Sequence, residues 1–152
     1  MTMREEFTTA MKDAMKSGDK EKLGAVRLIL SALKDKDIEN RGLGKPAASD
    51  EEILGILQKM IKQRQDSIAL YTQGARPELA AKEQMEIDVI AGFLPEQLGE
   101  HEIEAAVRAA IAEIGAAGIK DMGKVIGALK AKFAGRMDFA KASALIKQVL
   151  NG

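Results

Sequence analysis

The sequence contains no cysteine, no tryptophan and a single tyrosine among its 152 residues. The absence of cysteine excludes a disulfide framework and any metal site built from thiolates. No apolar run approaches the roughly 20 residues of a membrane-spanning helix, and the mixed charges of Met1–Glu6 do not fit a signal peptide. We therefore expect no membrane partner and a cytoplasmic location.

Aromatic residues make up only 3% of the chain, whereas hydrophobic residues as a class make up 46%. Most apolar side chains come from alanine, leucine, isoleucine and the 8 methionines. This composition favours helices over β-strands, because it is poor in the aromatic residues that strands prefer. The length suffices for one ordinary domain or two small ones, and for a real hydrophobic core.

Apolar residues recur at helical spacing along four stretches that precede residue 95. Gly18 is a natural end for the first helix, and Asp19 is a natural N-cap for the second. The stretch Ser49–Glu52 has the pattern of a capping box at the start of the third helix. Pro77 suits the first turn of the fourth. A loop over residues 40–46 is expected between the second and third helices.

The helical pattern breaks near Pro95, and three shorter helical segments follow it. Asp121 and Asp138 are the expected N-caps of the last two. The sequence therefore predicts an all-α fold without strands. An N-terminal bundle of four longer helices occupies residues 1–94, and a C-terminal three-helix module occupies residues 95–152.

Side chains that could carry catalysis are sparse. His101 is the only histidine, and it lies between two glutamates near a helix start, where a solvated side chain is the ordinary interpretation. Glu83 and Glu86 have the i, i+3 spacing of a helical metal motif, but no histidine accompanies them. No serine lies in a glycine elbow beside a base. We assign no catalytic residue, metal ligand or cofactor, and expect no enzyme activity from this chain alone.

Several polar residues are placed where they could face other helices of the N-terminal bundle. Arg64 and Tyr71 are seven positions apart and so share one face of the third helix. We interpret the set as interhelical ion pairs that fix helix register, with a pocket or partner surface as the alternative. The full set is Arg27, Arg64, Tyr71, Arg76, Glu83 and Glu86.

Charge is distributed unevenly along this neutral chain. Residues Ile119–Gly152 include seven basic and two acidic side chains, which leaves an excess of five positive charges. The preceding residues have an excess of five negative charges. Such separation indicates an anionic partner for the C-terminal end.

On a helical wheel of Met122–Ala134, Gly123 and Gly127 fall together with Ala131 and Ala134. A face with so few side chains lets another backbone come close, and lysines along its rims favour a phosphate backbone. The alternative is that the glycines admit a neighbouring helix of the same bundle and the lysines are ordinary solvated charge. The candidate nucleic-acid-binding residues are Lys120, Gly123, Lys124, Gly127, Lys130, Lys132, Gly135, Arg136 and Lys141.

Several short motifs follow one another along the chain, and their order is more specific than any one of them. They are Lys62–Ile68, Tyr71, Gly74–Arg76, Glu83, Glu86-Ile87, Leu94-Pro95, Asp121–Gly127, Gly135-Arg136 and Asp138. In this order they resemble the YqeY-like family over essentially the full length. That family is similar to the helical tail domain of the B subunit of the glutamyl-/aspartyl-tRNA amidotransferase.

The resemblance implies an all-helical fold in two parts and a contact between the terminal module and the body of a tRNA. The residues of the terminal module that match the family's motif are Gly123, Lys124, Gly127, Gly135 and Arg136. The leading hypothesis is a non-catalytic, tRNA-interacting accessory protein that contacts the sugar-phosphate backbone. The alternative is a protein–protein adaptor for an amidotransferase or an aminoacyl-tRNA synthetase. A third hypothesis, carbon–nitrogen ligase activity with glutamine as amide donor, rests on the family label alone.

Overall fold

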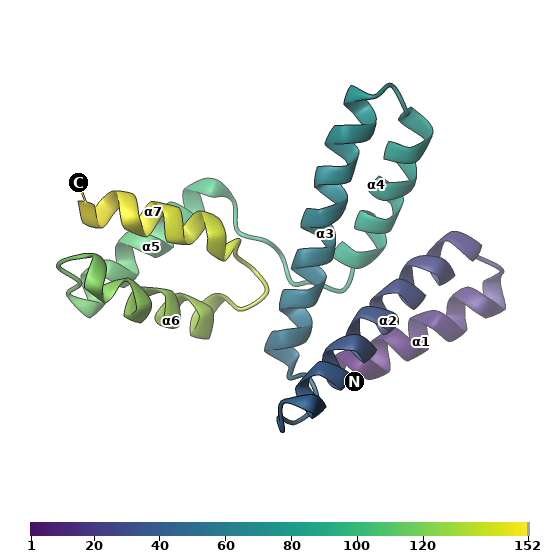
Figure 1. Cartoon of the computed structure of the whole chain (residues 1–152), viewed down its shortest axis with the longest axis horizontal. Coiled ribbons are helices and arrows are strands. Elements are labelled where there is room, and N and C mark those ends of the chain that lie inside the picture. Colours follow the sequence, from purple (N-terminus) through teal and green to yellow (C-terminus); the bar gives the residue numbers. More distant parts are fainter. Residues whose placement is uncertain (152) are drawn as a thin grey trace. The chain divides into compact units, whose positions relative to one another are not determined.

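The computed structural model describes residues 1–151, which form seven α-helices, one short 3-10 helix and no strand (Figure 1). The predicted all-α class is confirmed. None of these helices is both long and apolar enough to span a bilayer. The elements are α1 (Met3–Ser17), α2 (Lys20–Gly42), α3 (Asp50–Gln73), α4 (Pro77–Ala91), α5 (Glu100–Ile114), η1 (Ile119–Asp121), α6 (Met122–Phe133) and α7 (Phe139–Asn151).

The chain divides into two compact units, Met1–Leu94 and Pro95–Gly152. In the N-terminal unit, α1 packs along α2 and α3 packs along α4, so that two helical hairpins form (Figure 1). The hairpins meet where α2 contacts both α3 and α4. The core there includes Phe7, Ile29, Ile53, Leu57 and Ile90, each at most 1% exposed.

Helix ends in the N-terminal unit follow the local sequence. Gly18 ends α1 in the left-handed conformation, with φ of 73°. The Asp19 carboxylate accepts a hydrogen bond from the Lys22 N–H at the start of α2. Ser49 and Glu52 form the predicted capping box of α3. These features confirm the predicted starts of α2 and α3.

The second helix continues to Gly42, into the stretch that was expected to form a loop. Asn40 is fully buried, and its side-chain amide donates to the Glu52 carboxylate of α3 at 3.3–3.4 Å. Its carbonyl accepts from the Leu43 and Lys45 N–H groups. Asn40 thus links α2 to α3. This contact joins residues distant in the sequence, so the local pattern of loop-forming residues did not predict that the helix continues.

A second hydrogen-bonded contact joins the start of α1 to the C-terminal part of α2. The Arg4 guanidinium donates two 2.9 Å hydrogen bonds to the Asp37 carboxylate and one of 3.0 Å to the Ala48 carbonyl. Asp37 also accepts from the Ala48 N–H at 2.8 Å. The bonds from Arg4, followed by the bond from Ala48, lower the pKa of Asp37 from 3.8 to about 2. This tie fixes α1 and the loop before α3 on α2.

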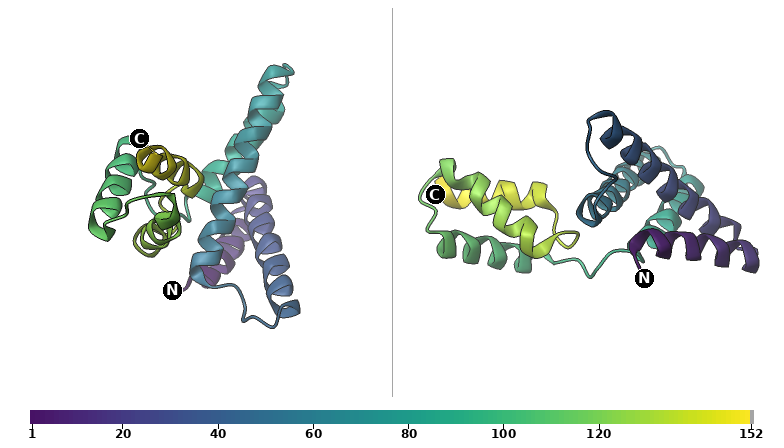
Figure 2. Two further views of the ribbon diagram at one scale, coloured as in Figure 1. Left: turned by 60° about the vertical axis from the view of Figure 1, so that its left-hand side comes forward. Right: turned by 90° about the horizontal axis from the view of Figure 1, so that it is seen from below.

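The C-terminal unit packs α5, α6 and α7 around one apolar core (Figure 2). Asp138 accepts from the Ala140 and Lys141 N–H groups, which confirms it as the cap of α7. The buried residues of this core are Ile103, Val107, Ala110, Val125, Leu129, Met137, Ala142 and Ile146.

The prediction that the Asp121 side chain caps α6 is wrong. Its carboxylate accepts from the Ala117 N–H at 3.0 Å and makes no capping bond to α6. The reason is that η1 runs directly into α6, so Asp121 already has near-helical angles of φ −90° and ψ −1°. Hydrogen bonds from the loop instead lower the pKa of Asp121, that from Ala117 most of all.

Candidate nucleic-acid interface on the C-terminal unit

The glycines of α6 lie on its solvent side. Gly123 and Gly127 are exposed, and a Cβ built on either would meet no atom within 4 Å beyond the local helix backbone. Ala131 continues this side and is exposed too, whereas Ala134 is half-buried just beyond the helix. We call Gly123, Gly127 and Ala131 the glycine face. The alternative that its glycines admit a neighbouring helix of the same unit is wrong.

The opposite side of α6 explains why the glycine face is left open. Val125 and Leu129 are at most 2% exposed and pack in the core of the unit. They are four residues apart and therefore share one face of the helix, roughly opposite the glycine face at about 100° per residue. One amphipathic helix buries its apolar face and leaves the other to water or to a partner.

Lysines border the glycine face, and all of them are exposed. Lys120 lies in η1, just before α6, and Lys124 follows Gly123 in the first turn. The Nζ of Lys130 lies 5.9 Å from the Phe139 ring centroid, a distance at which a cation is attracted to the ring. Lys132 lies 5.7 Å from the Phe133 ring in the same way. Two of the cations are therefore positioned by aromatic rings of the core edge.

Gly135 and Arg136 lie in the turn between α6 and α7. Gly135 is buried with φ of 76°, and its carbonyl accepts from the Gln97 side chain. Arg136 donates from Nε to the Glu96 carbonyl at 3.0 Å, and its own carbonyl accepts from the Leu98 N–H at 2.8 Å. These bonds attach the segment before α5 to the module. They account for both residues without any nucleic acid.

Lys141 belongs to a different helix from the other predicted lysines. It lies on α7, and its Nζ is 3.8 Å from the Glu100 carboxylate of α5, with both side chains well exposed. An exposed pair of this kind contributes little to stability. Of the nine predicted residues, the structure thus brings five together on one side of η1 and α6, namely Lys120, Gly123, Lys124, Gly127 and Lys130, whereas Lys132 lies toward the opposite side of α6.

Two exposed apolar residues flank the turn between α5 and η1. Ile119 and Ile114 are 42% and 36% exposed, at the start of η1 and at the end of α5. At helical spacing, Ile114 continues the apolar face of Ile103 and Val107, yet it is not buried. The signal that could have found them is the glycine pair Gly115 and Gly118, because a chain that turns there leaves its flanking residues without a packing partner.

In the N-terminal unit, one predicted interhelical ion pair is present. Arg64 Nε of α3 lies 3.7 Å from the Glu86 carboxylate of α4, and the two side chains are only 14% and 9% exposed. Arg64 also donates from Nη1 to the Met60 carbonyl at 3.1 Å, while its buried Nε has no hydrogen-bond partner. The interpretation as an interhelical pair is confirmed for these two residues.

The other four members of that polar set do not join the pair. Arg27 and Arg76 are exposed, and Tyr71 and Glu83 are half-buried. Across the part of the chain that the structure describes, none of the four takes part in a salt bridge. Among the described residues, the six therefore do not form one network of ion pairs. No group of three or more metal-ligating side chains occurs within residues 1–151.

Comparisons with known proteins all point to one family. The family model described as "Yqey-like protein" matches residues 4–150. The protein named "Altered inheritance of mitochondria protein 41, mitochondrial" from Pyrenophora tritici-repentis is 30% identical over 143 residues, which cover 92% of this chain and 76% of that protein. Proteins of the same name from Saccharomyces cerevisiae and Vanderwaltozyma polyspora are 37% and 38% identical, over 55% of this chain and 44% of theirs.

These relatives are named as mitochondrial proteins, and this finding contradicts the cytoplasmic location expected from the sequence. The expectation rested on the absence of a long apolar segment, which distinguishes membrane spans from other chains but not one aqueous compartment from another. The predicted family resemblance, by contrast, is confirmed. Because the family model matches nearly the whole length, the chain belongs to the YqeY-like family.

Proposed function

We propose that this chain is a tRNA-interacting accessory protein whose C-terminal unit binds the sugar-phosphate backbone of a folded tRNA through the glycine face. The observation that carries the proposal is the open side of α6. Gly123 and Gly127 leave room for a backbone to approach the helix, and Lys120, Lys124 and Lys130 border that room.

The physical basis is attraction of phosphates combined with close approach. Each lysine that neutralises a phosphate releases condensed counterions, which makes binding fall steeply with salt. A surface without stacking aromatics does not read bases, so shape and phosphate spacing determine the fit. Phe133 and Phe139 are half-buried against the core and carry lysines at their rings, so they are not free platforms for bases.

The distribution of charge within the C-terminal unit favours the approach of a polyanion from the side of α6. Residues 95–118, which include α5, contain five acidic and one basic side chain. The segment that follows, with α6 and α7, contains the excess of basic side chains. A polyanion approaching the unit is therefore attracted to the α6 side and repelled from the α5 side. Membership of the YqeY-like family, which resembles a tRNA-contacting tail domain, supports tRNA as that polyanion.

Titration of bulk tRNA with the full chain over a salt series tests the proposal. If Lys120, Lys124 and Lys130 each meet a phosphate, the slope of log affinity against log salt is about −2 to −3. The double variant Lys124→Glu with Lys130→Glu is expected to abolish binding. A matched control, Lys59→Glu with Lys62→Glu, makes the same charge change on exposed positions of α3 and is expected to retain it. Equal weak binding to heparin and tRNA, unaffected by the α6 changes, contradicts the proposal.

The alternative function is an adaptor between proteins, such as an amidotransferase and an aminoacyl-tRNA synthetase. The same open face favours it, because a helix face without side chains also accepts a partner helix. Nuclease treatment separates the two functions. A complex recovered through α6 that survives complete RNA digestion supports the adaptor, whereas loss on digestion supports the tRNA proposal.

A further inference from the structure

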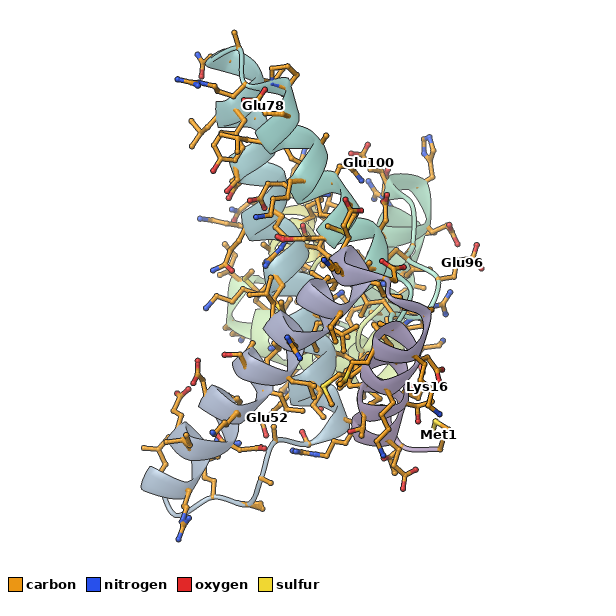
Figure 3. All side chains as sticks on the ribbon, turned by 90° about the vertical axis from the view of Figure 1, so that its right-hand side faces the viewer. Met1, Lys16, Glu52, Glu78, Glu96 and Glu100 are labelled. Carbon is orange, nitrogen blue, oxygen red and sulfur yellow. The ribbon has the colours of Figure 1, made fainter. Side chains whose placement is uncertain are left out.

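The short helix η1 carries an acidic side chain next to the lysines that border the glycine face. Asp121, the last residue of η1, is half-buried and lies in the sequence between Lys120 and Lys124. Acidic side chains elsewhere in the unit, such as Glu96 before α5 and Glu100 at its start, are exposed (Figure 3). A negative charge beside the glycine face opposes the approach of a phosphate, so the proposed tRNA contact does not by itself account for Asp121.

The backbone just before η1 has a point at which it can turn. Gly118 lies there in extended backbone, with φ of −164° and ψ of 176°, and a glycine has more accessible conformations than other residues. Within residues 111–122, backbone hydrogen bonds hold the chain on either side of Gly118 without crossing it. Before it, the Ala116 N–H donates to the Ile111 carbonyl at 3.1 Å. After it, the Asp121 N–H donates to the Gly118 carbonyl at 2.9 Å.

The Asp121 side chain supplies the hydrogen bond that crosses Gly118. Its carboxylate accepts from the Ala117 N–H at 3.0 Å and so links η1 to the residue before the glycine. None of the η1 residues is buried, and Ile119 is 42% exposed, so apolar packing restrains η1 less than it restrains α6. The carboxylate therefore restrains the direction in which η1 leaves the end of α5.

The position of Lys120 depends on that direction, because Lys120 is the middle residue of η1. It is exposed and makes no salt bridge among the described residues. The hydrogen bond from Ala117 lowers the pKa of Asp121 most, and the positive charges of Lys124 and Lys120 lower it further. The carboxylate and the two ammonium groups therefore form one electrostatic cluster at the start of α6.

We propose that Asp121 is a positioning residue of the tRNA-binding surface, which holds η1 so that Lys120 lies beside Lys124 and meets a phosphate at the edge of the glycine face. This inference rests on the proposed function. The carboxylate has two opposite effects on affinity, since its charge repels phosphates and its bond to Ala117 restrains Lys120. The two lysines offset the charge, whereas nothing else described in the turn replaces the bond, so the positioning effect is the larger one.

Two substitutions separate the charge of Asp121 from its hydrogen bond. Asp121→Asn removes the charge but keeps an oxygen that can accept from the Ala117 N–H, so its affinity for tRNA is expected to equal or exceed that of the parent chain. Asp121→Ala removes both, and its affinity is expected to lie about fivefold below that of Asp121→Asn. The slope of log affinity against log salt should also become less negative by about 0.7–0.9 in Asp121→Ala, because one phosphate contact is lost.

A matched control and a second background test the mechanism. Asp138→Ala makes the same change of charge and removes the hydrogen bonds from the Ala140 and Lys141 N–H groups at the start of α7. It also destabilises the unit, but it is expected not to weaken tRNA binding. In a chain that carries Lys120→Gln, the Asp121→Ala and Asp121→Asn variants are expected to bind tRNA equally, because the lysine that Asp121 positions is absent.

Other results overturn the inference. If Asp121→Ala and Asp121→Asn bind tRNA equally in the chain that retains Lys120, Asp121 is no more than a local negative charge. If Asp138→Ala weakens binding as much as Asp121→Ala does, or if the loss persists without Lys120, the effect is one of general stability. If the parent chain binds no tRNA, the proposed function fails and this inference fails with it, whereas a parent that binds tRNA with equal Asp121 variants refutes the inference alone.

Discussion

The two units of this chain have nearly the same net charge but use their charges differently. The N-terminal unit has 15 basic and 16 acidic residues, and the C-terminal unit has 8 and 7. In the N-terminal unit, two arginines form ion pairs between helices, Arg4 with Asp37 and Arg64 with Glu86. In the C-terminal unit, the core is apolar and the cations of α6 stay on its exposed side. The two units therefore differ in how their charges are arranged rather than in the sum of those charges.

The largest expected effect breaks the charge pairing of the N-terminal unit. Arg64→Ala leaves Glu86 as a buried carboxylate without a cation, which costs about 3 kcal/mol of unfolding free energy. Urea unfolding followed by circular dichroism measures it. Arg27→Ala removes an exposed arginine that takes part in no described salt bridge, and a change below about 0.5 kcal/mol is expected. Equal losses of unfolding free energy in the two variants would contradict the prediction that the buried arginine contributes more to stability than the exposed one.

A second prediction concerns the pH dependence of the Arg4–Asp37 tie. The pKa of Asp37 is about 2 in the fold, below its ordinary value of 3.8. Its contribution to stability is therefore fully present above about pH 4 and is lost as the pH falls toward about 2. Asp37→Asn is expected to lower the unfolding free energy by about 1–2 kcal/mol at pH 7. The difference from the parent chain should shrink below pH 4, and a constant difference down to pH 2 would contradict the assignment.

The third prediction sharpens the role of the glycine face. Gly127→Gln is expected to weaken tRNA binding about fivefold, because the new side chain occupies the space left for a phosphate backbone. The same change should raise the unfolding free energy by about 0.5–1 kcal/mol, since glycine is a poor helix former. Weaker tRNA binding together with a higher free energy of unfolding would show that the variant loses binding without losing stability. Gly55→Gln in α3 is the control, with the stability gain alone expected.

The helices could be predicted from the sequence because their signals are local. Apolar spacing and caps such as Ser49 and Asp138 act within a few residues of the chain. The functions of single polar residues were less predictable, since they depend on contacts between distant segments. Gly135 and Arg136 matched the family motif, but only the fold shows that they bind the segment before α5.

The smallest expected effect concerns a left-handed residue of the N-terminal unit that is not glycine. Ala75, between α3 and α4, has a left-handed φ of 57°, a conformation that Gly115 and Gly135 adopt in the C-terminal unit. A Cβ in that region meets the following carbonyl oxygen, at a cost of about 1 kcal/mol for alanine. Ala75→Gly removes this strain but gives the unfolded chain more freedom, so a net gain of about 0.5 kcal/mol is expected. Thermal unfolding of the full chain measures it, and a loss of stability would show that the Ala75 side chain makes a favourable contact that outweighs the strain.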